Sequence, residues 1–403
     1  MSTITADEVR DKLLPLDTVR ERLSQTEPVT GVTFAMNSPE SVGATFALDE
    51  GWAANTSLAE EAPVNGTVRI GPETYRLTKG ALLEMTSALN ITKKYAQKCP
   101  APLLVPHINH WCRTEDREVK ALVVPDTTGE HAGLVRAFTK ASIEPFSNLR
   151  FLDRAIESIE EKYGAGSEVL VDYKFHHDFE RTRLRLVVPD HVRSIREGDN
   201  WSAGVQIANS LIGASPTSLK GYMFRWWCTN GCITTRAESG SWNRRRGGQG
   251  EEVYEWARHA VDEILGGLEH EFEQVEIMAN TAVREDDLND VLADVFERYR
   301  VPLAAREHVI EEMVNSDDLT MYGIMQAVTQ AANNVELNGG DLPDHMAERL
   351  MTVGGDLPRA YADGTTAFVP EDEDAQIGLD QRHGMLTLDD GTTVPVQARR
   401  IRG

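Results

Sequence analysis

The stretch that decides the fold is GDNWSAGVQIANSLIGASPTSLKGYMFRWWCTNGC, residues 198–232. It holds three of the seven tryptophans and two of the four cysteines of the chain. Segments 201–207 and 222–228 are rich in β-favouring residues, and Asn230-Gly231 is a strong turn signal because both residues tolerate positive φ. We therefore predict two strands whose aromatic side chains pack inside the protein. Three side chains are expected to be buried: Trp201, Phe224 and Trp226.

Around this stretch, the composition is that of a globular protein. At 403 residues, with 41% hydrophobic residues, the chain has room for two domains and a sizeable core. It has no apolar run of about 18 residues, so no membrane span is expected. Residues 1–14, MSTITADEVRDKLL, lack the features of a secretory signal. Four cysteines do not make a disulfide framework. These observations favour a cytoplasmic protein, in the host cytoplasm if the protein is viral.

The net charge of −23 limits the partners of this acidic protein. It argues against attraction of the whole surface to nucleic acid or to an anionic membrane. It suits a soluble protein, and a halophilic host and a GC-rich genome are both compatible with the scarcity of Lys. Any contact with nucleic acid must therefore come from a local basic patch.

The periodicity of apolar residues predicts an α+β fold. The β-rich first half has short helices, a helical region follows, and a small hairpin ends the chain. Strands are expected over 29–36, 44–48, 67–70, 73–77, 119–124, 134–138, 168–175 and 182–188. Helices are expected over 5–25, 78–89, 91–98, 150–163, 251–280, 288–299, 305–314, 319–333 and 345–351, and the final hairpin over 385–396.

Local signals suggest where these elements begin and end. Thr78 is expected to cap the helix that follows it, and Ser316 with Asp317 the helix near residue 319. The proline-rich segment CPAPLLVPHIN, residues 99–109, is expected to end any helix. The predicted units are an α+β domain over 1–250, a helical region packed on it over 251–352, and a linker with a hairpin tail over 353–403.

The segment SWNRRRGGQG, residues 241–250, is the candidate nucleic-acid-binding site. Arg244, Arg245 and Arg246 are consecutive, follow Trp242, and have no acidic residue within the segment. Guanidinium groups match phosphate geometry, and an aromatic ring can stack on an unpaired base. Single-stranded nucleic acid is therefore the favoured partner. The alternative is a solvated loop that pairs with acidic neighbours, on this chain or on another subunit.

The cysteines are weak candidates for a metal site. Cys99 and Cys112 lie close to His107 and His110, and Cys228 and Cys232 form a C-x3-C pair. Structural zinc sites offer paired, closely spaced ligands on tight turns, and only the second pair approaches that spacing. Buried free thiols are the favoured alternative, so no metal and no cofactor is predicted. His176-His177-Asp178 is expected to be a solvated turn.

Three segments together resemble a known family. They are RLTKGALLEMTSALNITKKYAQKC at 76–99, the stretch at 198–232 with its ANS and RWWCTNG, and MYGIMQAVTQAANN at 321–334. In order and spacing they resemble the phage- and plasmid-like proteins of domain of unknown function 932, over roughly residues 70–350. The resemblance implies a mobile-element context. The family has no agreed activity, so it implies no catalytic residues.

Three functions follow as hypotheses. The first is a non-enzymatic, nucleic-acid-associated protein of a phage or plasmid, in single-strand binding or annealing. The second is an enzyme of unrecognised class that uses a metal at the Cys/His set. The third is a structural or assembly protein that forms a homo-oligomer through its helical half. No catalytic residue can be named from the sequence.

Overall fold

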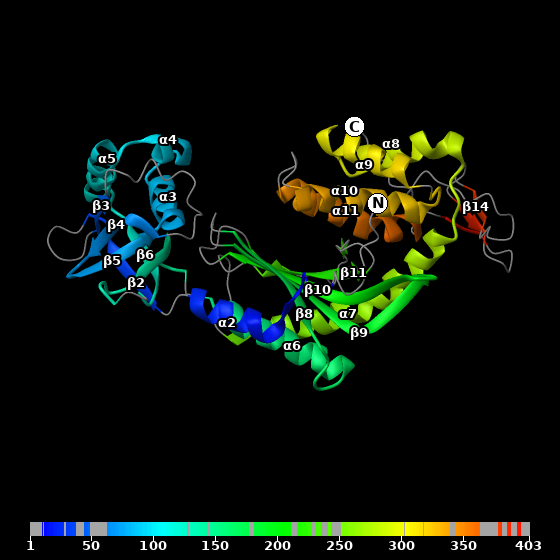
Figure 1. Ribbon diagram of the computed structural model, residues 1–403, viewed down its shortest axis with the longest axis horizontal. Helices are drawn as coiled ribbons and strands as arrows, with labels where there is room; N and C mark the ends of the chain where they lie inside the picture. Colours follow the sequence, from blue (N-terminus) through cyan, green and yellow to red (C-terminus); the bar gives the residue numbers. More distant parts are fainter. Residues whose placement is uncertain are drawn as a thin grey trace.

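The computed structural model describes residues 10, 12–27, 30–37, 44–48, 63–126, 129–143, 146–176, 181–210, 216–226, 231–234, 241–242, 251–301, 303–316, 318–338, 344–362, 378–380, 385–387 and 393–395. The fold is α+β, as predicted, with strands concentrated before residue 251 and helices after it. The described residues form two separate hydrophobic cores. Figure 1 shows two bodies, which we call the small domain (residues 30–140) and the large domain.

The small domain is a six-stranded sheet with three helices. The strands are β2 (Thr30–Ala35), β3 (Ala44–Leu48), β4 (Pro63–Ile70), β5 (Glu73–Thr78), β6 (Glu118–Val124) and β7 (Leu134–Lys140). Their spatial order is β2-β6-β7-β5-β4-β3, and only the β5–β7 pair is parallel. Helices α3 (Lys79–Ala88), α4 (Lys93–Lys98) and α5 (Ala101–Thr114) contribute to its core.

Two local predictions in this domain have different outcomes. The Thr78 cap is confirmed, because its hydroxyl accepts a hydrogen bond from Ala81 N at 3.1 Å. The predicted helix stop over 99–109 is wrong, since α5 continues through Pro106. The reason is burial: Leu104, Ile108 and Cys112 are spaced at i, i+4 and i+8 and are fully buried. That burial offsets the hydrogen bond that proline removes.

The large domain is built on a seven-stranded sheet. Its strands are β1 (Leu14–Pro15), β8 (Leu170–His176), β9 (Arg181–Arg196), β10 (Asp199–Ser210), β11 (Thr217–Arg225) and β12 (Gly231–Thr234), in that spatial order, with β13 (Ser241–Trp242) also paired to β11. The stretch at 198–232 supplies three of these strands. Trp201, Phe224 and Trp226 are all buried, as predicted.

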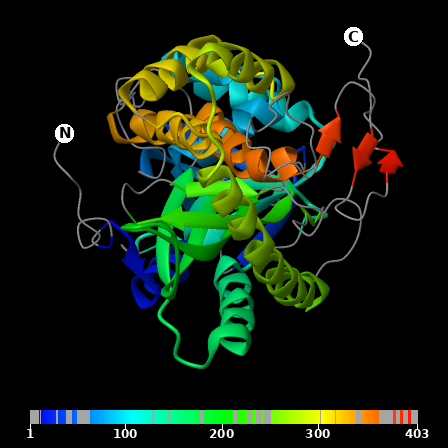
Figure 2. The ribbon, with the colours of Figure 1, turned by 90° about the vertical axis from the view of Figure 1, so that its right-hand side faces the viewer.

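Helices cover both faces of this sheet (Figure 1). On one side lie α2 (Leu16–Thr26), α6 (Asn148–Tyr163) and α7 (Glu251–Ala279), which packs against β9, β10 and β11. On the other lie α10 (Met321–Asn338) and α11 (Asp344–Ala362), with α8 (Leu288–Arg298) and α9 (Leu303–Asn315) outside them. The turned view in Figure 2 shows the same layers. Among the described residues, no helix is long and apolar enough to cross a membrane.

The cores do not follow the predicted division at residue 250. The small core lies wholly within 1–250, whereas the core of the large sheet begins before it, at Leu13, and includes the helices after residue 251. The small domain is an insertion, because α2 before it and α6 after it belong to one core. The two ends of the insertion meet where Glu27 accepts hydrogen bonds from Ser147 Oγ at 2.8 Å and from Leu149 N.

Residues 353–362, expected to be linker, are the second half of α11. Gly354 and Gly355 permit close packing there. A Cβ on Gly354 would lie 2.3 Å from a methyl group of Thr329 in α10, and one on Gly355 would lie 2.3 Å from the carbonyl oxygen of Ile233 in β12. These glycines therefore let α11 contact its neighbours instead of marking a loop. The final strands β14 (Gly378–Asp380), β15 (Met385–Thr387) and β16 (Thr393–Pro395) pair as a small antiparallel sheet that includes the predicted hairpin.

Candidate functional site

One end of the large sheet anchors the predicted arginine segment. β13 pairs antiparallel with β11, with Trp242 opposite Thr217. The same backbone row continues through Asn209 of β10 and Thr182 of β9 to Phe175 of β8. Trp242 therefore lies at the end of the sheet where β8 and β10 end and β9 begins.

A chain of buried hydrogen bonds holds this end of the sheet together. Thr217 Oγ donates to Asn209 Oδ1 at 2.8 Å, and Asn209 Nδ2 donates to Asn148 Oδ1 at 2.8 Å. Asn148 Nδ2 donates to Thr182 Oγ at 3.2 Å. All four residues are buried, so the chain joins three strands to the first turn of α6. The result is a rigid platform.

Cationic side chains gather around this platform. Lys174 and Arg183 stand directly opposite each other in the β8–β9 pair, and Arg181 begins β9. From the small domain, the guanidinium of Arg136 lies 5.1 Å from the centre of the Phe175 ring. Arg181 is exposed and Lys174 is half-buried, whereas Arg136 and Arg183 are each only 6% exposed. We call Arg136, Lys174, Arg181 and Arg183 the basic end.

The predicted binding residues themselves are only partly placed. The backbone of Trp242 lies in β13. Arg244, Arg245 and Arg246 lie outside the described residues.

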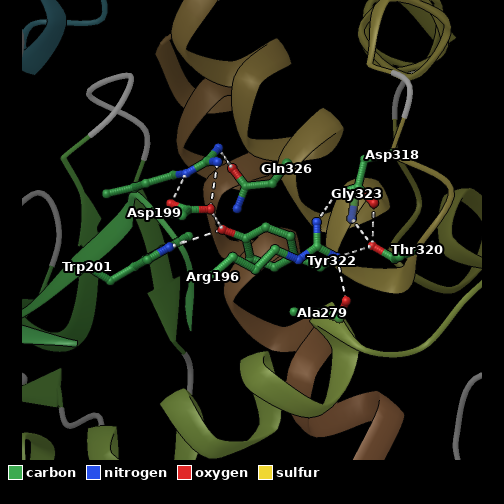
Figure 3. A network of polar contacts seen from close by, with 10 residues as sticks. Arg196, Asp199, Trp201, Ala279, Asp318, Thr320, Tyr322, Gly323 and Gln326 are labelled. Atoms are coloured by element: carbon green, nitrogen blue, oxygen red, sulfur yellow. Dashed lines mark hydrogen bonds and ion pairs between the residues drawn. The ribbon is translucent and has the colours of Figure 1, made fainter. Parts of the chain in front are cut away.

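A second polar site joins two of the segments that carry the family resemblance (Figure 3). Arg225 of β11 forms two hydrogen bonds to Asp199 of β10, at 2.6 and 2.7 Å. Tyr322 of α10 donates its hydroxyl hydrogen to the same carboxylate and accepts from Trp201 Nε1 at 3.1 Å. Arg225 also donates to Gln326 of α10. The network thus ties two strands of the sheet to the first turns of α10.

The neighbouring part of this network corrects the cap predicted for α10. Thr320 caps the helix instead of Ser316, because its hydroxyl accepts a hydrogen bond from Gly323 N at 3.1 Å, and Asp317 lies outside the described residues. Arg196 donates to Asp318 at 2.7 Å and to Thr320 Oγ at 3.2 Å. Its guanidinium lies 4.9 Å from the centre of the Tyr322 ring. The cap and the strand arginine therefore form one unit.

An open cavity of about 330 Å³ is lined by Arg196, Asp199, Arg225, Asp318, Tyr322 and Gln326. The polar groups of these residues bond to one another, so we call the network the clamp between the large sheet and α10. Burial raises the pKa of the Tyr322 hydroxyl, which the positive charge of Arg225 opposes. Asp199 is engaged by a guanidinium and by this hydroxyl. The Asp199 carboxylate therefore has a structural role, and the Tyr322 hydroxyl stays protonated. We assign this network to positioning α10 on the sheet.

The described cysteines lie in different cores. Cys99 and Cys112 are buried in the small domain and Cys232 in the large one, so these three are not brought together. Cys228, His177 and Asp178 lie outside the described residues. Burial raises the pKa of the Cys112 thiol to about 12, which opposes the thiolate form that binds metal. Within the described ranges, no three His, Cys, Asp or Glu side chains are grouped to hold a metal ion.

Comparison with known proteins adds no relative: no family model matches the chain, and neither does any curated protein or solved structure. The resemblance to domain of unknown function 932 stays a prediction. Sequence reasoning missed Asp199, Arg225 and Tyr322 as a unit. The sequence does hold a signal for this network, because Asp199 and Arg225 stand beside apolar strand residues. A charged side chain in such a position is buried only when it has a partner.

Proposed function

We propose that this chain is a non-enzymatic, nucleic-acid-associated protein that binds single strands at the basic end. The observation that carries the proposal is the register of β13. Through β13 the backbone of Trp242, two residues before Arg244 in the sequence, lies at the sheet end that also holds Lys174 and Arg181. We propose that these cations act together with Arg244, Arg245 and Arg246 in a protein whose net charge is −23.

Contacts with phosphates explain how a local group of cations can bind nucleic acid on a protein that is acidic as a whole. Each Lys or Arg that neutralises a phosphate releases condensed counterions, so the binding energy comes from the contacts and not from the net charge of the protein. Trp242 adds a ring that can stack on an unpaired base. Phosphate contacts alone would hold single and double strands alike, and stacking would favour single strands. The proposed setting is the cytoplasm of a cell that carries a phage or plasmid, as the family resemblance implies.

The test is a salt titration of binding. Affinities for single- and double-stranded DNA and RNA are measured between about 50 and 200 mM salt, a range over which phosphate contacts dominate. The variant replaces Arg244, Arg245 and Arg246 by Ala. It should flatten the plot of log affinity against log salt by about two to three units, at about 0.7–0.9 per lost contact.

The matched control removes the same charge elsewhere. Arg284, Arg298 and Arg300 are exposed in the helical region, and their replacement by Ala should leave the slope unchanged. Trp242→Ala should weaken single-strand binding by about 1–3 kcal/mol with little effect on duplex. A wild type that binds no nucleic acid at about 50 mM salt, or a triple variant with the full slope, would refute the proposal.

A second function, assembly of a homo-oligomer through the helical half, is favoured by one observation. Leu303, Ile310 and Val314 share one face of α9, and Leu303 and Val314 are each 78% exposed. Exposed apolar faces of this kind commonly mark protein interfaces. Light scattering after size exclusion tests it: an oligomer that Ile310→Glu with Val314→Glu dissociates would support assembly, and a monomeric wild type would not.

A further inference from the structure

The outer surface of the small domain carries exposed rings on two neighbouring helices. Tyr95 of α4 is 48% exposed, and Leu103 and Trp111 of α5 are 64% and 39% exposed. His107 joins the helices, because its ring centre lies 6.3 Å from that of Tyr95. His110 lies edge-on to Trp111 with 5.5 Å between ring centres. We call these five residues the α4–α5 surface.

Helix geometry explains why these side chains point outward together. Positions 103, 107, 110 and 111 recur at the spacing of one face of α5, and all four are exposed. The opposite face, with Leu104, Ile108 and Cys112, is buried against the small sheet. The exposed rings are therefore not core residues left over by loose packing. They form one ordered surface, which the imidazole contacts hold in place.

The charges around these rings are cationic. Residues 91–117 contain five Lys or Arg and two acidic residues, in a chain where acidic residues outnumber basic ones by 64 to 41. Lys93 pairs with Glu84 at 2.9 Å, and Arg117 donates to Ala88 O. Lys94, Lys98 and Arg113 are exposed, and none of them forms an ion pair with a residue that the structure describes.

We propose that the α4–α5 surface binds a single-stranded nucleic acid. Bases stack on Trp111 and Tyr95, and Lys94, Lys98 and Arg113 contact phosphates. Exposed aromatic rings interleaved with unpaired cations are the combination by which proteins hold single strands without sequence preference. Duplex bases are already stacked, so the rings select single strands. This inference rests on the proposed nucleic-acid function, but it uses residues that are separate from the basic end.

The spacing of the rings fits this role. Trp111 lies one helical turn beyond His107, about 6 Å along the axis at 1.5 Å per residue. Because His107 contacts Tyr95, the two exposed rings present successive platforms across α4 and α5. Leu103 extends the apolar contact by another turn toward the start of α5. Such a row can follow an extended strand, whereas a membrane would require a broader continuous apolar face.

The test measures fluorescence anisotropy of a labelled oligothymidylate and of a duplex of equal length, at about 50 mM salt where phosphate contacts are strong. Trp111→Ala should weaken binding of the oligothymidylate by at least about fivefold, and Tyr95→Ala should act in the same direction, with duplex affinity unchanged. Trp111→Phe keeps a stacking ring and should retain most of the affinity. Replacing Lys94, Lys98 and Arg113 by Ala should lower the single-strand salt slope by about two units, at about 0.7 per contact.

Controls separate this proposal from the proposed function. Val192→Ala with Ile277→Ala removes exposed apolar side chains of the large domain and should change nothing. Binding that is lost with the Arg244, Arg245 and Arg246 variant but kept with Trp111→Ala would overturn this inference and leave the basic end in place. The reverse result would support this surface and refute the basic end. No binding by the wild type overturns both, and binding only to vesicles with about 30% phosphatidylserine overturns this one.

Discussion

Replacing Tyr322 by Phe tests the clamp between the large sheet and α10. The change removes one hydroxyl and keeps the ring, which stays packed beside the guanidinium of Arg196. It deletes the hydrogen bond donated to the Asp199 carboxylate and leaves Trp201 Nε1 without its acceptor. Trp201 is fully buried, so water does not replace that acceptor without a local opening of the structure.

The expected cost follows from these two losses. A hydrogen bond to a charged group contributes about 1.5–3 kcal/mol, and a buried donor left unsatisfied costs about 1–3 kcal/mol. Since the surroundings relax and Arg225 still compensates Asp199, we expect the free energy of unfolding to fall by about 2–4 kcal/mol. Asp199→Ala should cost about 3–5 kcal/mol, because it leaves the largely buried Arg225, whose side chain is 17% exposed, without its carboxylate.

Urea denaturation followed by tryptophan fluorescence measures both variants, with the transition midpoint read at an unchanged slope. Tyr163→Phe is the control, because no hydrogen bond from the Tyr163 hydroxyl is present among the described residues. It should change the free energy of unfolding by less than about 0.5 kcal/mol. A loss below about 1 kcal/mol for Tyr322→Phe, or a loss equal to that of the control, would refute the clamp.

Three other predictions concern stability. Gly355→Ala should destabilise the protein by about 1–3 kcal/mol, because the new methyl group meets the backbone of β12; an unchanged urea midpoint would contradict this contact. Pro106→Ala should raise the unfolding free energy by about 1–3 kcal/mol, since it restores a helix hydrogen bond, and a lower midpoint would argue against a regular α5. Burial raises the pKa of Cys112, Tyr163 and Tyr299 to about 12, so the stability that their neutral forms provide is complete below about pH 9 and is lost toward pH 12. Melting temperatures should fall over that range, and less steeply for Tyr299→Phe.

Local patterns predict the elements whose neighbours in space are also neighbours in sequence. The hairpin of β8 and β9 alternates apolar and polar residues, and the Thr78 cap needs only the three residues that follow it. Helix α5 is different. A proline within a helix costs about 3 kcal/mol, but burying Leu104 and Ile108 contributes about 1.5–3 kcal/mol each, and the local sequence does not reveal that burial. Tertiary packing decides such cases.

The candidate sites divide in the same way. The run of arginines with a neighbouring Trp at 241–250 is visible in the sequence. The structure adds only the strand pairing of Trp242 with Thr217. The clamp is not visible, because Asp199 and Tyr322 are separated by 123 residues. Leu103 and His107 of the α4–α5 surface lie in the segment whose prolines were expected to end any helix, and only a helix puts them on one face with Trp111.

The insertion of the small domain sets an order of events during synthesis. Every strand and helix of the small core lies before residue 141, so that core can close while the rest is still being made. β1 and α2 emerge earlier but must wait for β8, whose partner residues follow about 155 positions later. At about 5–20 residues per second, that wait lasts roughly 8–30 s. Until α6 and β8 follow, the apolar side of α2 has no native partner, so a nascent chain stalled near residue 141 should be the form that chaperones bind most readily.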